Sequence, residues 1–214
     1  MRDADRPSVL LTGFGPFPGV EMNASARLVR RLAARTRRRF PDYRVATAIL
    51  PTEWEDGPTR LARHLARARP LLALHFGVSR EARGFVIETQ GRNACHDSTD
   101  AKGRHPPKSQ LDDHGPETRP ARLPVAAIAE RLAAAAFPVA TSDDAGGYLC
   151  NAVLYRSLAE AEAGTGAALA GFVHIPVDLE DADTPLPLAA ALDGGIEIIA
   201  ACLDELATVR VPTG

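Results

Sequence analysis

The chain has 214 residues, of which 45% are hydrophobic and 24% charged, and its formal net charge is −2 at pH 7. This length allows one large α/β domain or two small ones, and the absence of a linker or repeat in the sequence predicts a single domain over residues 1–214. The small net charge argues against a field-driven partner such as nucleic acid or a membrane surface. Three scattered cysteines argue against a disulfide framework and a zinc ribbon. The N-terminus lacks the apolar core of a signal peptide and no apolar run is long enough to span a bilayer. We therefore expect a cytoplasmic protein with reduced thiols.

In the first half of the chain, short apolar runs alternate with helical periodicities. These patterns predict helices at 23–39 and 59–69, and strands at 8–12, 43–50, 71–76 and 84–90. The run 71–76 is expected to be a wholly apolar strand. The first helix carries seven arginines opposite its apolar face. Because the net charge is negative, these arginines indicate a solvated helix surface rather than an RNA-binding one.

Between the first strand and the first helix lies a loop of turn-forming residues, 13–19, that contains Phe14 and Phe17. A loop offers aromatic side chains little core to enter. The two rings therefore either plug the floor of the domain or line a ligand pocket. The glycines of this loop have neither the dinucleotide-binding nor the P-loop spacing, which argues against a nucleotide site.

The second half begins with a polar segment, 94–120, that holds His96, His105 and His114. Their spacing matches no zinc pattern, so we expect a solvated loop or lid and no metal site. The patterns beyond it predict helices at 125–136 and 186–207, a helix around Cys150 that ends near 163, and strands at 137–141 and 170–176. This alternation predicts an α/β fold, a three-layer α/β/α sandwich around a mostly parallel, mixed and twisted sheet.

The segment 144–151 predicts a tight turn followed by a helix with Cys150 near its N-terminus. Ser142, Asp143 and Asp144 offer capping side chains for this helix, and two glycines permit the turn. At a helix N-terminus the peptide dipoles favour a thiolate, and free backbone N–H groups point at an incoming ligand. Cys150 is therefore either the nucleophile of an acyl-transfer site or a small buried side chain.

Two further polar residues interrupt apolar runs. Glu88 is an acid in the run 84–90, and a buried carboxylate must find a partner or become protonated. His174 lies near the carboxyl end of the run 170–176, and open α/β sheets bind ligands at that edge. If the strands are parallel, their ends bring Glu88, Cys150 and His174 together. A thiol, an imidazole and an acid are the groups that nucleophilic hydrolysis needs.

Three segments resemble motifs of a known family. The segments 11–25, 144–151 and 171–176 are similar to the N-terminal, cysteine and histidine motifs of pyroglutamyl peptidase I, the pyrrolidone-carboxylate peptidases. The resemblance covers nearly the whole chain. It implies a cysteine exopeptidase, an omega-peptidase that removes an N-terminal pyroglutamyl residue from peptides through a thioester intermediate.

The resemblance also assigns roles to individual residues. It implies that Cys150 is the nucleophile, His174 the base and Glu88 the orienting acid. Phe14 and Phe17 would sandwich the flat lactam ring of the substrate. The rest of the implied substrate pocket is formed by Asn23, Val78 and Leu149. The implied reaction requires no cofactor and no metal, and the family suggests a homo-oligomer, either a dimer or a tetramer.

Around Glu88 the chain departs from the family pattern. Arg80 stands where a small residue is expected, Val86 replaces Ser or Thr, and Thr89 replaces Lys or Arg. These changes concern the substrate preference more than the chemistry. Two alternatives therefore stay open: a diverged cysteine hydrolase of another cyclic or acyl amide, and a catalytically silent binding relative of the same fold.

Overall fold

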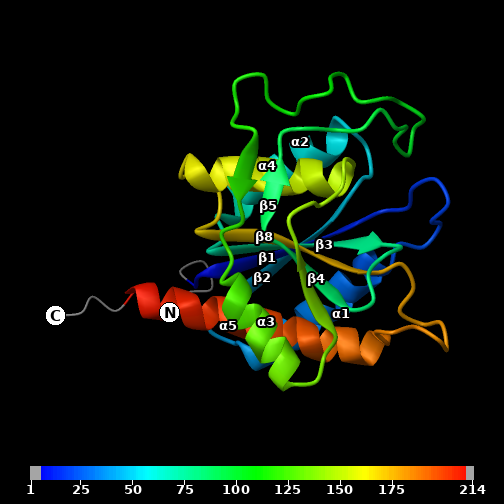
Figure 1. Cartoon of the computed structure of the whole chain (residues 1–214). Coiled ribbons are helices and arrows are strands. Elements are labelled where there is room, and N and C mark those ends of the chain that lie inside the picture. Colours follow the sequence, from blue (N-terminus) through cyan, green and yellow to red (C-terminus); the bar gives the residue numbers. More distant parts are fainter. Residues whose placement is uncertain (1–5, 211–214) are drawn as a thin grey trace.

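The computed structural model describes residues 6–210 (Figure 1). Its helices are α1 (Ala24–Arg39), α2 (Asp56–Ala68), α3 (Val125–Ala134), α4 (Leu149–Glu162) and α5 (Leu188–Arg210). Its strands are β1 (Ser8–Phe14), β2 (Arg44–Leu50), β3 (Leu72–Ser79), β4 (Phe85–Glu88), β5 (Gln90–Arg92), β6 (Thr118–Pro120), β7 (Val139–Ser142) and β8 (Leu169–Pro176). In this range no helix has the length and apolar character needed to cross a bilayer. The prediction of one domain over residues 1–214 extends beyond the described range and stays a prediction.

Within the described range, a six-stranded sheet with the order β2-β1-β3-β8-β4-β7 forms the centre of the fold. The first four strands are parallel to one another, whereas β4 is antiparallel to β8 and parallel to β7. Helices α1, α3 and α5 cover one face of the sheet, and α2 and α4 cover the other (Figure 1). The predicted three-layer α/β/α sandwich with a mixed, mostly parallel sheet is confirmed.

Each face of the sheet packs into its own apolar core. Val9 and Leu11 of β1 belong to the core under α1 and α5, whereas Leu10 belongs to the core under α2 and α4. Successive residues of a strand point to opposite faces, so β1 contributes to both cores and is buried along its whole length. This explains why the run appears in the sequence as continuously apolar rather than alternating.

Strand β3 contains one buried polar side chain, His75, so the prediction of a wholly apolar strand is wrong at this position. The two ring nitrogens of His75 lie 2.8 Å from Thr12 Oγ1 and 2.8 Å from Ser157 Oγ, which links β1, β3 and α4. Burial lowers the pKa of His75 to about 3, so the ring is neutral at physiological pH. A single satisfied histidine does not change the apolar character of the run, and the sequence pattern therefore gave no sign of it.

Several predicted boundaries move in the structure. Strand β1 continues to Phe14, which therefore lies in a strand and not in the loop. The predicted strand 84–90 is divided at Thr89 into β4 and β5, which belong to different sheets. Strand β6 lies at the end of the predicted loop 94–120 and pairs with β5. An apolar run does not reveal the residue at which a strand changes its partner.

The polar segment between β5 and β6 crosses over α2 and α4 (Figure 1). One of its anchors is Asp100, which is 2% exposed. The Asp100 carboxylate accepts hydrogen bonds from the backbone N–H groups of Trp54, Lys102 and Arg104 at 3.1, 2.8 and 2.9 Å. The Trp54 bond therefore ties the predicted solvated loop to the segment that precedes α2, and the other two bonds hold the loop's own turn.

Candidate active site

Cys150 is the second residue of α4. The first hydrogen bond within this helix end runs from Ala152 N–H to Tyr148 O at 3.1 Å. The N–H groups that precede Ala152 therefore have no acceptor inside the helix and point out of its end. Tyr148, Leu149 and Cys150 line a cavity of about 560 Å³ at this end.

The turn before α4 is stabilised by its own polar side chains. Asp144 N–H donates to Ser142 Oγ at 3.0 Å, and Gly146 N–H donates to Asp144 Oδ1 at 3.0 Å. The N-cap of α4 is Tyr148, whose side chain makes no capping hydrogen bond. The prediction that Ser142, Asp143 and Asp144 cap this helix is therefore wrong. The positive end of the helix dipole stays open to a ligand.

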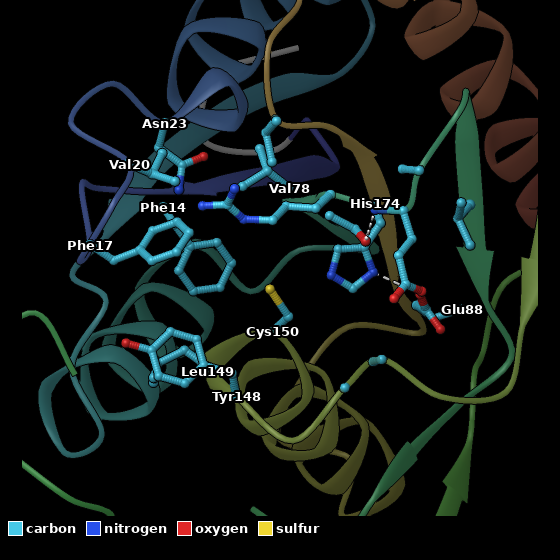
Figure 2. A pocket seen from close by; sticks show the side chains of 18 of the residues that line it. Phe14, Phe17, Val20, Asn23, Val78, Glu88, Tyr148, Leu149, Cys150 and His174 are labelled. Atoms are coloured by element: carbon cyan, nitrogen blue, oxygen red, sulfur yellow. Dashed lines mark hydrogen bonds and ion pairs between the residues drawn. The ribbon is translucent and has the colours of Figure 1, made fainter. Parts of the chain in front are cut away.

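His174 of β8 and Glu88 at the end of β4 are almost fully buried, with 7% and 1% of their surface exposed. His174 Nδ1 lies 2.7 Å from Glu88 Oε1, and Figure 2 shows the opposite side of the ring turned towards Cys150. The structure thus brings the three predicted residues together. The prediction that parallel strands bring Glu88 to this site is wrong, because β4 is antiparallel to β8 and Val86 of β4 pairs with His174. Glu88 reaches His174 from the neighbouring strand rather than from a shared carboxyl edge.

The charges around His174 determine its protonation. Burial disfavours the charged ring, but the Cys150 thiolate and the Glu88 carboxylate outweigh this effect and raise the pKa of His174 to about 10. The ring is therefore protonated on both nitrogens, as an imidazolium, at neutral pH. Glu88 Oε2 is buried without a hydrogen-bond partner among the described residues. The hydrogen bonding of this carboxylate is thus directed at His174 alone.

Gly77 provides the space in which the sulfur lies. It is the register partner of His174 across β3 and β8. A Cβ atom at Gly77 would lie 2.8 Å from Cys150 Sγ and 2.6 Å from Phe172 Cζ, closer than side chains approach. The missing side chain therefore allows the thiol to lie against the backbone of β3 beside the imidazole.

Phe14 and Phe17 both line the cavity, but they are held differently. Phe14 is 2% exposed and packs against Phe172, with the ring centroids 6.1 Å apart. Phe17 is half-buried, and its ring lies 6.1 Å from that of Tyr148. The backbones of Phe17 and Val20 exchange hydrogen bonds of 3.1 and 2.8 Å, which fixes the turn carrying the ring. Phe14 thus belongs to the core and to the cavity wall at the same time.

The other predicted pocket residues, Asn23, Val78 and Leu149, line the same cavity (Figure 2). Asn23 uses its polar atoms within the protein: Nδ2 donates to Gly15 O at 3.1 Å, and Oδ1 accepts from Ser25 N–H at 3.1 Å. Asn23 therefore connects the loop to the start of α1. Leu149 is fully buried and forms the floor of the cavity.

Two cavity residues, Tyr148 and Thr52, are not indicated by the sequence reasoning. The Tyr148 ring packs edge-on against Trp54 at 5.2 Å, and its hydroxyl donates to Thr99 O at 3.1 Å. Thr52 Oγ1 donates to Gly15 O at 3.1 Å. An aromatic residue directly before the cysteine helix was a usable signal for Tyr148, whereas no sequence feature distinguishes Thr52.

The three positions that depart from the family pattern differ in location. Arg80 and Val86 line the cavity, whereas Thr89 does not. Thr89 Oγ1 instead donates to Ser142 O at 2.9 Å and so binds the end of β7. A change at Thr89 therefore concerns the sheet, and the changes at Arg80 and Val86 concern the cavity.

Within residues 6–210, no group of three or more His, Cys, Asp or Glu side chains is arranged to hold a metal ion. The groups that converge on the cavity are a thiol, an imidazole, a carboxylate and outward-pointing backbone N–H groups. This set is suited to nucleophilic attack on an acyl carbon.

Comparison with known proteins identifies the family. The family model for pyroglutamyl peptidase matches residues 7–190. The chain belongs to the pyroglutamyl peptidase family. The pyrrolidone-carboxylate peptidase of Halalkalibacterium halodurans is 31% identical over 173 residues, which cover 80% of this chain and 85% of the relative. The corresponding peptidase of Gloeobacter violaceus is 35% identical over 169 residues, which cover 78% and 80%.

Solved structures of the pyroglutamyl peptidase family agree with this assignment. The crystal structure of pyrrolidone carboxyl peptidase from Pyrococcus furiosus aligns with a TM-score of 0.83 and 26% identity. The alignment covers 93% of this chain and 99% of that one. The chain is therefore a peptidase, and the family resemblance seen in its motifs is confirmed.

Proposed function

We propose that this pyroglutamyl peptidase family member hydrolyses the amide bond after an N-terminal pyroglutamyl residue, with Cys150 as nucleophile. His174 acts as general acid and base, and Glu88 orients its ring. The observation that carries the proposal is the 2.7 Å contact between His174 Nδ1 and Glu88 Oε1, with the thiol on the other side of the ring. This arrangement fixes the ring so that its second nitrogen serves the sulfur and the leaving group.

In the first step, the Cys150 thiolate attacks the carbonyl carbon of the pyroglutamyl residue and a C–S bond forms. The electron pair of the C=O bond moves to the oxygen, where the open N–H groups at the start of α4 stabilise the charge. The His174 imidazolium donates a proton to the amide nitrogen. The C–N bond then breaks, which releases the shortened peptide and leaves a thioester on Cys150.

In the second step, water attacks the thioester carbon while neutral His174 accepts one of its protons. The C–S bond breaks, and the products are pyroglutamic acid, which loses its proton to solvent, the Cys150 thiolate and the His174 imidazolium. The raised pKa of His174, about 10, favours this return to the ion pair. The lactam is uncharged, so packing against Phe14 and Phe17 is expected to supply much of its binding.

The proposal is tested with a fluorogenic pyroglutamyl amide. The wild type should turn it over, Cys150→Ser should be inactive, and Glu88→Gln should lower kcat by about 10²–10⁴-fold while the fold persists. Cys95→Ala is the matched control, because Cys95 does not line the cavity. Mass spectrometry of acid-quenched wild type should detect an acyl group on Cys150. A folded wild type without turnover, or full activity in Glu88→Gln, would contradict the assigned roles.

A further inference from the structure

Arg80 places a cation in the cavity of an enzyme whose proposed substrate ring is uncharged. It follows directly after β3 and lines the same cavity as Cys150 and His174. Its side chain is exposed, and its Nη2 atom lies 3.6 Å from the position that a Cβ on Gly19 would occupy. The guanidinium therefore crosses from the end of the sheet to the turn that carries Phe17.

This turn has a defined geometry that brings Arg80 to the ring side of the cavity. Pro18 and Gly19 are the central residues between Phe17 and Val20, and Gly19 has a φ of 81°. Proline followed by a positive-φ glycine is typical of a type II turn. The guanidinium lies against this turn, two residues from Phe17.

Among the described residues, Arg80 has no carboxylate within ion-pair distance. The other charges near the cavity differ in this respect. Arg92 pairs with Asp144 at 2.9 Å, and His174 pairs with Glu88 at 2.7 Å. Glu81 also lines the cavity. Glu81 is the residue next to Arg80 in the chain, and it is therefore included in the experiment below.

A guanidinium has five donors and no acceptor, and because Arg80 is exposed, water bonds to these donors until a ligand oxygen in the cavity replaces it. The pyroglutamyl ring has one such oxygen at its edge, the lactam carbonyl. We infer that Arg80 donates a hydrogen bond to the lactam carbonyl oxygen of the substrate and is a specificity residue of this chain. The inference rests on the proposed function, because it concerns the same cavity and the same acyl group.

The inference predicts how the enzyme distinguishes two rings of similar size. Proline has a methylene group where pyroglutamate has the carbonyl, so a prolyl substrate leaves Arg80 without its acceptor. A site that is built to bond a substrate oxygen rejects the analogue that lacks it. Removing Arg80 should therefore weaken the reaction of the pyroglutamyl substrate and leave that of the prolyl substrate nearly unchanged.

The experiment measures kcat/KM for pyroglutamyl, prolyl and glutamyl amides of one fluorophore. Arg80→Ala should lower kcat/KM for the pyroglutamyl amide by about 10- to 100-fold, the range of one charge-assisted hydrogen bond. The ratio of pyroglutamyl to prolyl activity should fall by the same factor. Arg80→Lys, which keeps the charge, should give an intermediate ratio. Arg60→Ala is the matched control, since Arg60 is an exposed arginine that does not line the cavity.

Failure of the inference is distinguishable from failure of the proposed function. A wild type that hydrolyses the pyroglutamyl amide, with an unchanged ratio in Arg80→Ala, would overturn the role of Arg80 alone. A collapsed ratio in Glu81→Gln would overturn it too, because recognition would then depend on Glu81. A wild type that prefers the glutamyl amide would show that Arg80 pairs with a carboxylate, and that result would overturn both proposals.

Discussion

At the scale of single residues, the site depends on a glycine, Gly77, which has no side chain to occupy the space next to the Cys150 sulfur. Gly77 lies beneath Cys150 Sγ, and a Cβ there would lie 2.8 Å from the sulfur. In Gly77→Ala the thiol must move away from His174, and we expect kcat/KM to fall by about 10²-fold, as for a 1 Å misplacement. Far-UV circular dichroism should show a retained fold. Gly15→Ala is the control, because its Cβ would meet only Leu50 O at 3.7 Å. Near-normal activity in Gly77→Ala would contradict this account.

Substitution of the two phenylalanines should have different effects, mainly on stability for Phe14 and mainly on substrate binding for Phe17. Phe14 is 2% exposed, so Phe14→Ala should lower the free energy of unfolding by about 3–5 kcal/mol. Phe14 belongs to the core as well as to the cavity wall, so its loss should affect stability as well as binding. Phe17 is half-buried, and Phe17→Ala should mainly raise KM. Urea unfolding and steady-state kinetics of both variants measure these effects. Equal losses of stability would contradict the distinction.

The three thiols should differ in reactivity. Burial raises the pKa of the Cys95 thiol, and it raises that of Cys202, with the Glu205 charge, to about 12. Cys150 is partly exposed and lies beside the imidazolium of His174. Iodoacetamide at mildly acidic pH should therefore label Cys150 first, with activity lost in proportion. Peptide mass spectrometry identifies the labelled site, and faster labelling of Cys95 with full activity would reject the assignment.

At the scale of elements, the sequence predicted which segments form strands and helices but not how they are directed. The run 84–90 is apolar whichever way it crosses the sheet, so nothing in it shows that β4 is antiparallel. The identity of Glu88 as an acid in an apolar run was sufficient to single it out. The position of Thr52 in the cavity and the anchoring of the polar loop depend on contacts between distant segments, which one sequence does not contain.

The loop between β5 and β6 should support the cysteine helix through Asp100. Asp100→Ala removes the acceptor of three backbone N–H groups, and the lost charge-assisted bonds should cost at least about 1.5–3 kcal/mol of stability. Because Tyr148 bonds to Thr99 O, a loosened loop should also lower kcat/KM. Limited proteolysis should cut the variant faster within 94–117. Asp97→Ala is the control, since the Asp97 side chain is 86% exposed. Equal cutting of both variants would contradict the anchor.

At the scale of the whole molecule, two histidines give stability opposite dependences on pH. The pKa of His75 falls from 6.5 to about 3 on folding, so the unfolded chain binds the proton more tightly. Stability should therefore decrease by about 1.4 kcal/mol per unit as the pH falls from 6.5 towards 3. The lowered pKa of Asp100, whose backbone hydrogen bonds overcome its burial, acts with the same sign.

His174 affects the stability of the fold at alkaline pH. Its folded pKa of about 10 lies above the unfolded value of 6.5, so its contribution is complete below pH 6.5 and is lost as the pH rises through 10. Urea unfolding at a series of pH values should show both slopes. His174→Gln should remove the alkaline slope and keep the acid one. Retention of both slopes in this variant would contradict the assignment.

The reversed direction of β4 also has a consequence for the order of assembly. The Glu88–His174 contact joins residues 86 positions apart, and β8 lies between β3 and β4 in the sheet. A nascent chain that ends before β8 already contains the nucleophile and the acid, but it lacks both the base and the strand that joins β4 to the rest of the sheet. Such long-range pairings form late in folding, because the entropy cost of closing a large loop comes before the contacts can stabilise the chain. The time at which a newly made chain first shows activity therefore reports when β8 has been inserted and the sheet is complete.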